Sequence, residues 1–591
     1  MTLTKTKLGW ILIALLTLAA LSLRVRGIAH GLPTSLELDC KIPRQVELLR
    51  QGGEAWRTDK EFRWYPLLVA HLAKSLPPPV PAAADAPLPQ QLQAAAAPHI
   101  QTRLLVALLA VLAIPLTYLL AQSFVSRRWA LLAAALVATS LLHHNFSQQS
   151  RPHAVSGTLF LAAVVASLRL RRKGNVLNYS LAGAACAASL GCLQTGVFTL
   201  PALVAGHLGR RTATKKWFDV RLVLPLVLIV LSLPVFYPFL FLTDPGEAAS
   251  NTKNLGFDSA SWTVYLGGHE IFLKRFLGGG VKPTVWALWS YDPTLLVLLL
   301  AAAVAWLLRK KPLAGAPRED DFSRRRDLVV VLSFVLPYSL TLLLYDRTYE
   351  RFLIPLLPFV AVWGAWALRE LAKRCEKLVP ALAEPQGQIA LAGFVLLLPS
   401  WGSWKLSQIR AAPHTTTLAA RWLETSARPD MDVRLWPGLD LPLPRELESI
   451  GPWPGPKIEL EARFQWPWTR YQAQHPEWRA DERWKLRWWP AKLIQMRNEP
   501  GTYVAEQMGE LAVVEVFADN RADPAGTAVR QALQRDMELL ARFTPDGPGT
   551  GSEHPLGCQE ETSVQPPAFL WRVLGATGTG PVIEVYGRPR R

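Results

Sequence analysis

The sequence predicts a polytopic α-helical membrane protein with about eleven spans and a folded carboxy-terminal α/β or α+β domain outside the bilayer. Of the 591 residues, 50% are hydrophobic, which is too many on average for a string of soluble domains. Long runs rich in Leu, Ala and Val fill residues 8–404, whereas residues 405–591 are polar and rich in Pro and Trp. We therefore expect a membrane domain at 1–404 and a soluble domain at 405–591.

The apolar runs predict where the chain crosses the bilayer. We expect spans at residues 8–23, 104–124, 129–142, 154–168, 177–190, 191–208, 222–242, 293–308, 328–344, 352–368 and 389–404. The first run resembles a signal peptide, but Arg24-Val25-Arg26 stands where a cleavage site of small residues would lie. We therefore expect it to remain as the first span.

Basic clusters give these spans an orientation. Lys and Arg gather at every second boundary, at 127–128, 171–173, 210–216, 309–326 and 373–374. The positive-inside rule places these clusters and the amino terminus in the cytoplasm, so the large loops 24–103 and 243–292 and the tail lie outside a bacterial-type inner membrane. The net charge of +18 is thereby assigned to topology, and no nucleic-acid partner is expected.

The first outer loop is too long to serve as a simple connection. Its stretch 76–98 is rich in Pro and Ala and is expected to be flexible, whereas 37–70 carries charged and aromatic residues. Glu37 and Asp39 come just beyond the first span. A carboxylate at such a place can act as a general base or hold a divalent cation, and its common alternative roles are to face solvent or to cap a helix.

Three motifs resemble glycosyltransferase family 39, the relatives of the protein O-mannosyltransferases and of the lipid A aminoarabinose transferase. They are Gly31-Leu32-Pro33 with Asp39, Tyr65-Pro66-Leu67-Leu68 and Arg103; the segment from His144 to His153; and the segment from Tyr349 to Pro358. The family belongs to the glycosyltransferase C superfamily. The resemblance implies many spans, a catalytic Asp in the first outer loop and a polyprenyl-phosphate sugar as donor.

The resemblance also implies roles for individual residues. Asp39 is the expected general base, with Glu37 as the alternative. Arg351 is expected to bind the lipid-linked phosphate, against an alternative role as an interfacial anchor. Arg151 and His153 are expected to meet the phosphate or the acceptor, against ordinary loop polarity. Tyr65, with Trp64, is expected to line the donor groove, against a place in the interfacial aromatic belt.

Two departures from the family pattern concern acidic residues. Members often carry adjacent Asp-Glu in the first loop, where this chain has Asp39-Cys40, and many carry an Asp before the fourth span, where this chain has Arg151 and His153. The missing acids argue against a divalent cation as cofactor, although that alternative stays open. They also keep open the alternative of a non-catalytic family member that acts as a binding or assembly subunit.

The expected function is therefore inverting transfer of a sugar from a polyprenyl-phosphate donor to a lipid, glycan or protein acceptor outside the membrane. A lipid-linked-saccharide transporter is a further alternative, but such proteins show internal repeats and mid-span charges, and this sequence has no convincing repeat.

Two other segments carry structural expectations. The amphipathic stretch from Trp262 to Arg275 predicts a helix lying on the outer membrane surface. In the tail, residues 433–436, 511–517 and 582–586 have strand-like patterns. The Trp-dense stretch 466–489 either stacks on carbohydrate or lies in a core.

Overall fold

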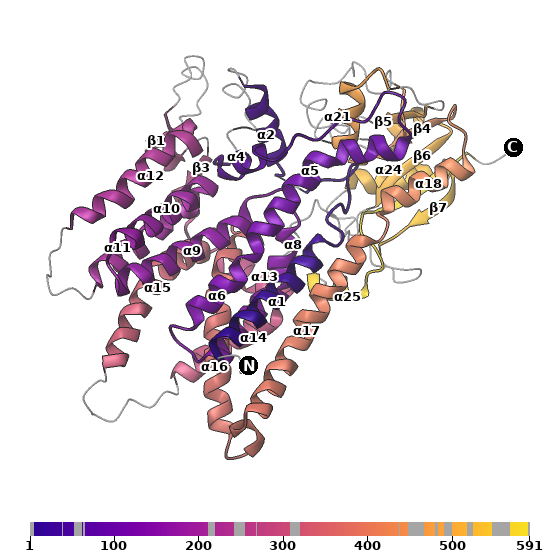
Figure 1. Ribbon diagram of the computed structural model, residues 1–591. Coiled ribbons are helices and arrows are strands. Elements are labelled where there is room, and N and C mark those ends of the chain that lie inside the picture. The colour runs from indigo at the N-terminus through magenta and orange to yellow at the C-terminus, as the bar shows by residue number, and fades with distance from the viewer. Residues whose placement is uncertain are drawn as a thin grey trace.

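Long helices run side by side through one part of the molecule, and a sheet with flanking helices covers one end of them (Figure 1). The computed structural model describes residues 5–37, 39–52, 62, 65–210, 219–241, 255–266, 269–307, 319–436, 438–446, 466–478, 483–489, 499–516, 524–545 and 568–588. The amino terminus lies at the end of the helices opposite to the sheet, and the carboxy terminus lies beside the sheet (Figure 1).

Every predicted span coincides with helical structure. The helices are α1 (Lys5–Val25), α5 (Leu88–Val111), α6 (Ala113–Ala121), α7 (Arg127–Thr139), α8 (Leu141–Ser147), α9 (His153–Arg172), α10 (Val176–Cys192), η2 (Gln194–Thr199), α11 (Leu200–Leu208), α12 (Val223–Phe236), α13 (Val281–Tyr291), α14 (Pro293–Leu307), α15 (Glu319–Leu344), η6 (Glu350–Leu356), α16 (Leu357–Cys375) and α17 (Pro385–Ala411). Two short helices, α2 (Ile42–Gln51) and α4 (Leu68–Lys74), lie in the first loop.

The helix lengths support a polytopic membrane protein. Within the described ranges, six helices are long and apolar enough to cross a membrane, and a seventh span exists if the bent pair α7 and α8 crosses as one. Three shorter apolar helices, at 176–192, 220–236 and 293–307, accompany them. The total of eleven spans and the side on which each terminus lies stay predictions.

The bent pair α7 and α8 has a polar partner at each side of its break. The two helices meet at Ser140 with a bend of 51°. Arg24, buried at the end of α1, donates to the carbonyl oxygen of Ala138 at 3.2 Å. Asp292 accepts hydrogen bonds from the Ser140 hydroxyl at 2.7 Å and the Leu141 amide at 2.8 Å. A cation thus meets the carbonyl end of α7 and an anion meets the amide end of α8.

The prediction of a flexible Pro/Ala-rich stretch at 76–98 is wrong for residues 88–98. Helix α5 begins at Leu88 and continues through Pro98 into the second span. Its first turns pack against Trp468, Tyr471 and Trp478, on and just after helix α21 (Pro467–Gln474). Ala-rich sequence has high helix propensity, and the aromatic contacts supply the tertiary packing that a short helix needs.

The prediction of a surface helix between Trp262 and Arg275 is also wrong. This segment belongs to a three-stranded antiparallel sheet of β1 (Leu255–Asp258), β2 (Thr263–Leu266) and β3 (His269–Phe272). Thr, Val and Tyr at successive positions of β2 favour strand, and the Asp258 carboxylate accepts from the Ala260 amide to close the first turn.

A five-stranded mixed sheet lies at the end of the helices that is opposite to the amino terminus (Figure 1). Its order is β5 (Lys485–Trp488), β4 (Asp432–Leu435), β6 (Leu511–Val516), β8 (Val582–Gly587) and β7 (Glu538–Phe543). Strands β5, β4 and β6 are parallel, whereas β8 pairs antiparallel with β6 and β7. The strands expected at 433–436, 511–517 and 582–586 are confirmed as β4, β6 and β8.

Helices cover both faces of this sheet. Helix α18 (Thr415–Ser426) packs on one face through Ala419 and Leu423, and α23 (Pro500–Glu506) and α24 (Pro524–Asp536) pack on the other through Tyr503 and Leu533. The described part of the tail therefore has an α/β arrangement. Its expected position outside the bilayer stays a prediction.

The Trp residues of the stretch 466–489 are core residues. Trp466, Trp468, Trp478, Trp484, Trp488 and Trp489 are all buried. Several of their indole groups donate hydrogen bonds to backbone carbonyls, as Trp468 does to the carbonyl oxygen of Leu443 at 2.8 Å. Of the two alternatives for this stretch, burial in a core is the one that the structure supports.

Close helix packing in the membrane part depends on Gly206 of α11. A Cβ atom placed there would come within 2.6 Å of the backbone oxygen of Ser167 on α9. We expect Gly206→Ala to destabilise the protein by about 1–3 kcal/mol, the usual cost of overpacking. Gly393→Ala in α17 is the matched control, because its Cβ meets no atom within 4 Å. Thermal unfolding in detergent measures both, and an equal midpoint for the two variants would contradict this packing.

Candidate functional site

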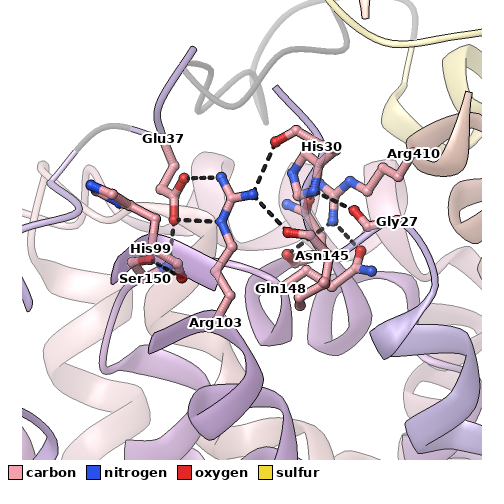
Figure 2. A network of polar contacts seen from close by, with 10 residues as sticks. Gly27, His30, Glu37, His99, Arg103, Asn145, Gln148, Ser150 and Arg410 are labelled. Carbon is pink, nitrogen blue, oxygen red and sulfur yellow. Dashed lines mark hydrogen bonds and ion pairs between the residues drawn. The ribbon is translucent and has the colours of Figure 1, made fainter. Parts of the chain in front are cut away.

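Two adjoining groups of polar residues lie where the first loop meets the helix ends. Figure 2 shows the first, in which Glu37 from the loop, Arg103 from α5, Ser150 from the α8–α9 connection and Arg410 from α17 belong to one network. The second group surrounds Asp39. We call them the clamp network and the arginine cluster.

The centre of the clamp network is a buried ion pair. Arg103 Nη2 donates to Glu37 Oε2 at 2.6 Å, and neither side chain is exposed. The Ser150 amide donates to the other Glu37 oxygen. Burial alone would raise the pKa of Glu37, but the charge and hydrogen bond of Arg103 outweigh it and hold this pKa at about 2.

The same arginine fixes the chain that follows the first span. Arg103 Nη1 donates to the carbonyl oxygens of Ile28 at 2.8 Å and His30 at 2.9 Å. Arg410 donates to the Gln148 side chain at 2.6 Å, and Gln148 in turn donates to the backbone of Arg24 and Arg26, with several of these residues labelled in Figure 2. The clamp network therefore binds the end of α1, α5, the α8–α9 connection and α17 together.

The arginine cluster consists of Asp39, Tyr65, Arg151, His153 and Arg351. Arg351 Nη2 lies 3.3 Å from Asp39 Oδ2, across 312 residues of sequence. The Asp39 side chain is 24% exposed, whereas that of Glu37 is fully buried. Asp39 has a positive φ of 58°, a left-handed conformation that Asp adopts more readily than most residues.

Aromatic rings and a second guanidinium complete the arginine cluster. Arg351 lies over the ring of Tyr349 at 4.5 Å. His153, the first residue of α9, contacts the rings of Tyr65 and Phe352 with centroid distances of 5.8 Å each. The charges of Arg351 and Arg151 both act on His153. Among the described residues of the cluster, the Arg351 guanidinium thus lies beside the Asp39 carboxylate and within electrostatic range of Arg151, and two guanidinium groups near the start of a helix favour a bound anion.

The structure brings together five of the six residues predicted for the site. Asp39, Tyr65, Arg151, His153 and Arg351 form the arginine cluster, and Glu37 lies in the clamp network beside it. Trp64 lies outside the described residues. Whether these residues perform the expected chemistry stays a prediction, but the geometry distinguishes the two carboxylates. A carboxylate with both oxygens engaged and a pKa of about 2 is a weak base, so the clamp arrangement favours Asp39 over Glu37.

Sequence reasoning missed several members of both groups. Arg410 carries no signal in the sequence beyond being a polar residue near an apolar run, whereas Gln148 lies inside the segment from His144 to His153 that resembles the family. Glu350 and Tyr349 flank Arg351 inside a motif that had already been noticed, so the motif itself was a usable signal. Tyr291 and Asp292, which contact η6 and α8, stand in a loop with no resemblance attached.

The donor set does not fit a divalent cation. Asp39 is paired with a guanidinium instead of a second carboxylate, and no trio of His, Cys, Asp or Glu in the described part of the chain gathers as ligands. Burial raises the pKa of the Cys40 thiol, which therefore stays protonated and is a poor ligand.

No protein-family model matches the chain, and no curated protein is similar to it. Similar solved structures include the oligosaccharyltransferase AglB from Archaeoglobus fulgidus in complex with an inhibitory peptide and a dolichol-phosphate, at 12% identity and a TM-score of 0.43, covering 92% of this chain and 74% of that one. Another is ArnT from Cupriavidus metallidurans bound to undecaprenyl phosphate, at 13% identity and a TM-score of 0.40, covering 90% and 96%.

A third similar structure is the arabinofuranosyltransferase AftD from Mycobacteria, at 15% identity and a TM-score of 0.39, covering 100% of this chain and 40% of that one. At such low identities and TM-scores, none of the ligands or activities of these structures is carried over to this chain.

The clamp network predicts a strong dependence of stability on Glu37. Glu37→Gln leaves the buried Arg103 guanidinium without its carboxylate, so we expect the free energy of unfolding to fall by about 3–5 kcal/mol. Glu47→Gln is the control, because the Glu47 side chain is 31% exposed and pairs with Arg470 near the surface. Equal thermal midpoints for the two variants would contradict the clamp role.

The pKa of Glu37 fixes the pH range of this effect. Because the folded-state pKa of about 2 lies below the ordinary 4.5, the stabilisation is complete above the ordinary value and is lost as the pH falls through the folded value. The difference between wild type and Glu37→Gln should therefore stay constant from about pH 5 to 8. A difference that changes across this range would show that Glu37 is not held ionised.

Proposed function

We propose that this protein transfers a glycosyl group from a polyprenyl-phosphate carrier to an acceptor outside the membrane, with inversion at the sugar carbon. The observation that carries the proposal is the arginine cluster at the end of apolar helices, in which Asp39 lies 3.3 Å from Arg351 and the charge of Arg151 acts on the same guanidinium. A base and two phosphate-binding cations within one small site are the groups that such a reaction needs.

The two guanidinium groups suit the phosphate of the donor. Guanidinium forks bind phosphate oxygens in bidentate geometry, and they stabilise the charge that develops as the phosphate leaves. The start of α9 at His153 adds backbone amides that favour an anion. The rings of Tyr65, Tyr349 and Phe352 surround these charges, so an isoprenoid chain next to the phosphate would meet apolar surface.

The transfer step balances with the groups of the arginine cluster. The acceptor hydroxyl or amine attacks the anomeric carbon, and Asp39 takes the proton that the acceptor loses. The bond between the anomeric carbon and the phosphate oxygen breaks, and the bonding electrons leave with the polyprenyl phosphate. Because phosphate is a good leaving group, the step needs no separate general acid.

A non-catalytic binding subunit is the second candidate function. The observation that favours it is the ion pair between Asp39 and Arg351, since a carboxylate that is engaged by an arginine is not available to an acceptor. In the catalytic proposal, the donor phosphate replaces Asp39 as the partner of Arg351, so that Asp39 can accept the proton of the acceptor. Both candidates bind the donor, and turnover distinguishes them.

The role of Asp39 is testable by substitution. Asp39→Asn keeps the shape of the side chain but removes its basicity, so we expect release of polyprenyl phosphate from undecaprenyl-phosphate sugars to fall by about 10²–10⁴-fold. Asp85→Asn, at an exposed position of the same loop, is the control and should keep full turnover. Binding of donor without turnover in the wild type would favour the non-catalytic subunit, and full turnover in Asp39→Asn would remove Asp39 from the mechanism.

The role of Arg351 is testable because it is expected to affect binding of the donor and not binding of the acceptor. Arg351→Lys keeps the positive charge but loses the planar fork, so we expect the KM for the donor to rise about tenfold or more while the KM for the acceptor stays unchanged. Arg347→Lys, at an exposed arginine of the same loop, is the matched control. Steady-state kinetics measure the split, and an equal rise of both KM values would argue for loss of folding instead.

A further inference from the structure

Helix α25 (Phe569–Gly575) comes from the sheet part of the chain but packs among the membrane helices. It lies in the connection between strands β7 and β8, whose two ends meet where the Thr577 and Gly578 amides donate to the Pro545 carbonyl at 2.7 and 3.0 Å. Phe569, Leu570 and Val573 nevertheless belong to the hydrophobic cluster that α1, α7, α9 and α16 build. The connection therefore extends from the sheet to the helices, as the position of α25 beside α17 in Figure 1 shows.

The docking of α25 is specific at three points. The Phe569 amide donates to the Ser290 hydroxyl at 2.7 Å, and the Phe569 ring stacks on Tyr291 with centroids 4.4 Å apart. Leu570 lies against Gly402 of α17, where an added Cβ would come within 2.7 Å of its side chain. The hydrogen bond to Ser290, the ring stack on Tyr291 and the contact with Gly402 together define one position for this helix.

One of the residues that receive α25 also contacts the residue that precedes Arg351 of the arginine cluster. Tyr291 Oη donates to the buried Glu350 carboxylate at 3.4 Å, and Glu350 directly precedes Arg351 in η6. The charges of Asp39 and Glu350 both act on Arg351, so Glu350 competes with any bound phosphate for this guanidinium. By holding Glu350, the Tyr291 hydroxyl limits that competition.

Asp292, the residue after Tyr291, is connected to Arg151 through helix α8. Asp292 accepts from the first amides of α8, at 2.8 Å from Leu141 and 3.3 Å from Leu142. Helix α8 ends at Ser147, and the connection after it carries Arg151. Residues 290–292 thus contact α25, the segment that bears Arg351 and the helix that leads to Arg151.

We propose that α25 is a latch through which the sheet part of the chain positions Arg351 and Arg151 for an anion, with Tyr291 as the positioning residue. The identity of the anion, a polyprenyl phosphate, rests on the proposed function. The coupling itself rests on the contacts of residues 290–292. Tyr291 does not touch the substrate in this scheme; it acts through Glu350.

The test uses the full chain in lipid nanodiscs, with undecaprenyl phosphate as the probe. Tyr291→Phe keeps the ring stack and removes the hydroxyl, so we expect the affinity for the probe to fall about three- to tenfold while the thermal midpoint stays close to that of the wild type. Tyr118→Phe, at a buried tyrosine of α6, is the matched control. Gly402→Leu displaces Leu570 and should produce the same loss of affinity through a different contact.

Amide hydrogen exchange over residues 350–356 provides a readout that needs no ligand. Faster exchange there in Tyr291→Phe and Gly402→Leu, but not in Tyr118→Phe, supports the latch. If the wild type binds the probe and both test variants match it in affinity and exchange, the latch is overturned while the proposed function stands. If the wild type does not bind the probe, the proposed function fails, and the exchange rates alone decide whether α25 positions η6.

Discussion

The buried pair of Arg103 and Glu37 is the interaction on which the site depends. A guanidinium inside a bundle of apolar helices is costly unless a counter-charge accompanies it, and here the first loop supplies that charge. Asp39 follows Glu37 by two residues, and Arg151 follows Ser150, whose amide binds the same carboxylate. Asp39 and Arg151 are thus both held next to this ion pair. The clamp network therefore fixes the distance between them without contacting a substrate itself.

The two carboxylates of the first loop differ in surroundings, and this difference divides their roles. Glu37 is fully enclosed, with its oxygens engaged by Arg103 and the Ser150 amide. Asp39 is partly exposed and held by a single cation at 3.3 Å. A fixed carboxylate suits a structural role, whereas a more loosely held one can exchange its partner for a substrate. The positions of the two carboxylates along the chain do not distinguish their roles, since both follow the same span.

Much of the fold was predictable because its signals are local. Apolar runs and strand patterns such as 582–586 depend on neighbouring residues, and each predicted span coincides with helical structure and each predicted strand with a strand. The start of α5 at Leu88 was not predictable, because Trp468 and Tyr471, which pack on it, lie far along the chain. The sheet at 255–272 was not predicted because the apolar residues of a short amphipathic stretch can fit the period of a helix or the period of a strand. Within the site, the resemblance supplied the residues of the arginine cluster, whereas the role of Tyr291 emerges only from three-dimensional contacts.

The break between α7 and α8 has a consequence for biosynthesis. Arg24, which meets the carbonyl end of α7, is translated before the break, whereas Asp292, which meets the amide end of α8, is translated some 150 residues after it. Until α13 and α14 have been synthesised and inserted, the first amides of α8 lack the Asp292 carboxylate and must hydrogen-bond to water instead. Arg351 and Phe569 are translated later still. The segments nearest the candidate site therefore acquire their final contacts late in synthesis, and a nascent chain halted before α13 holds an incomplete version of the site.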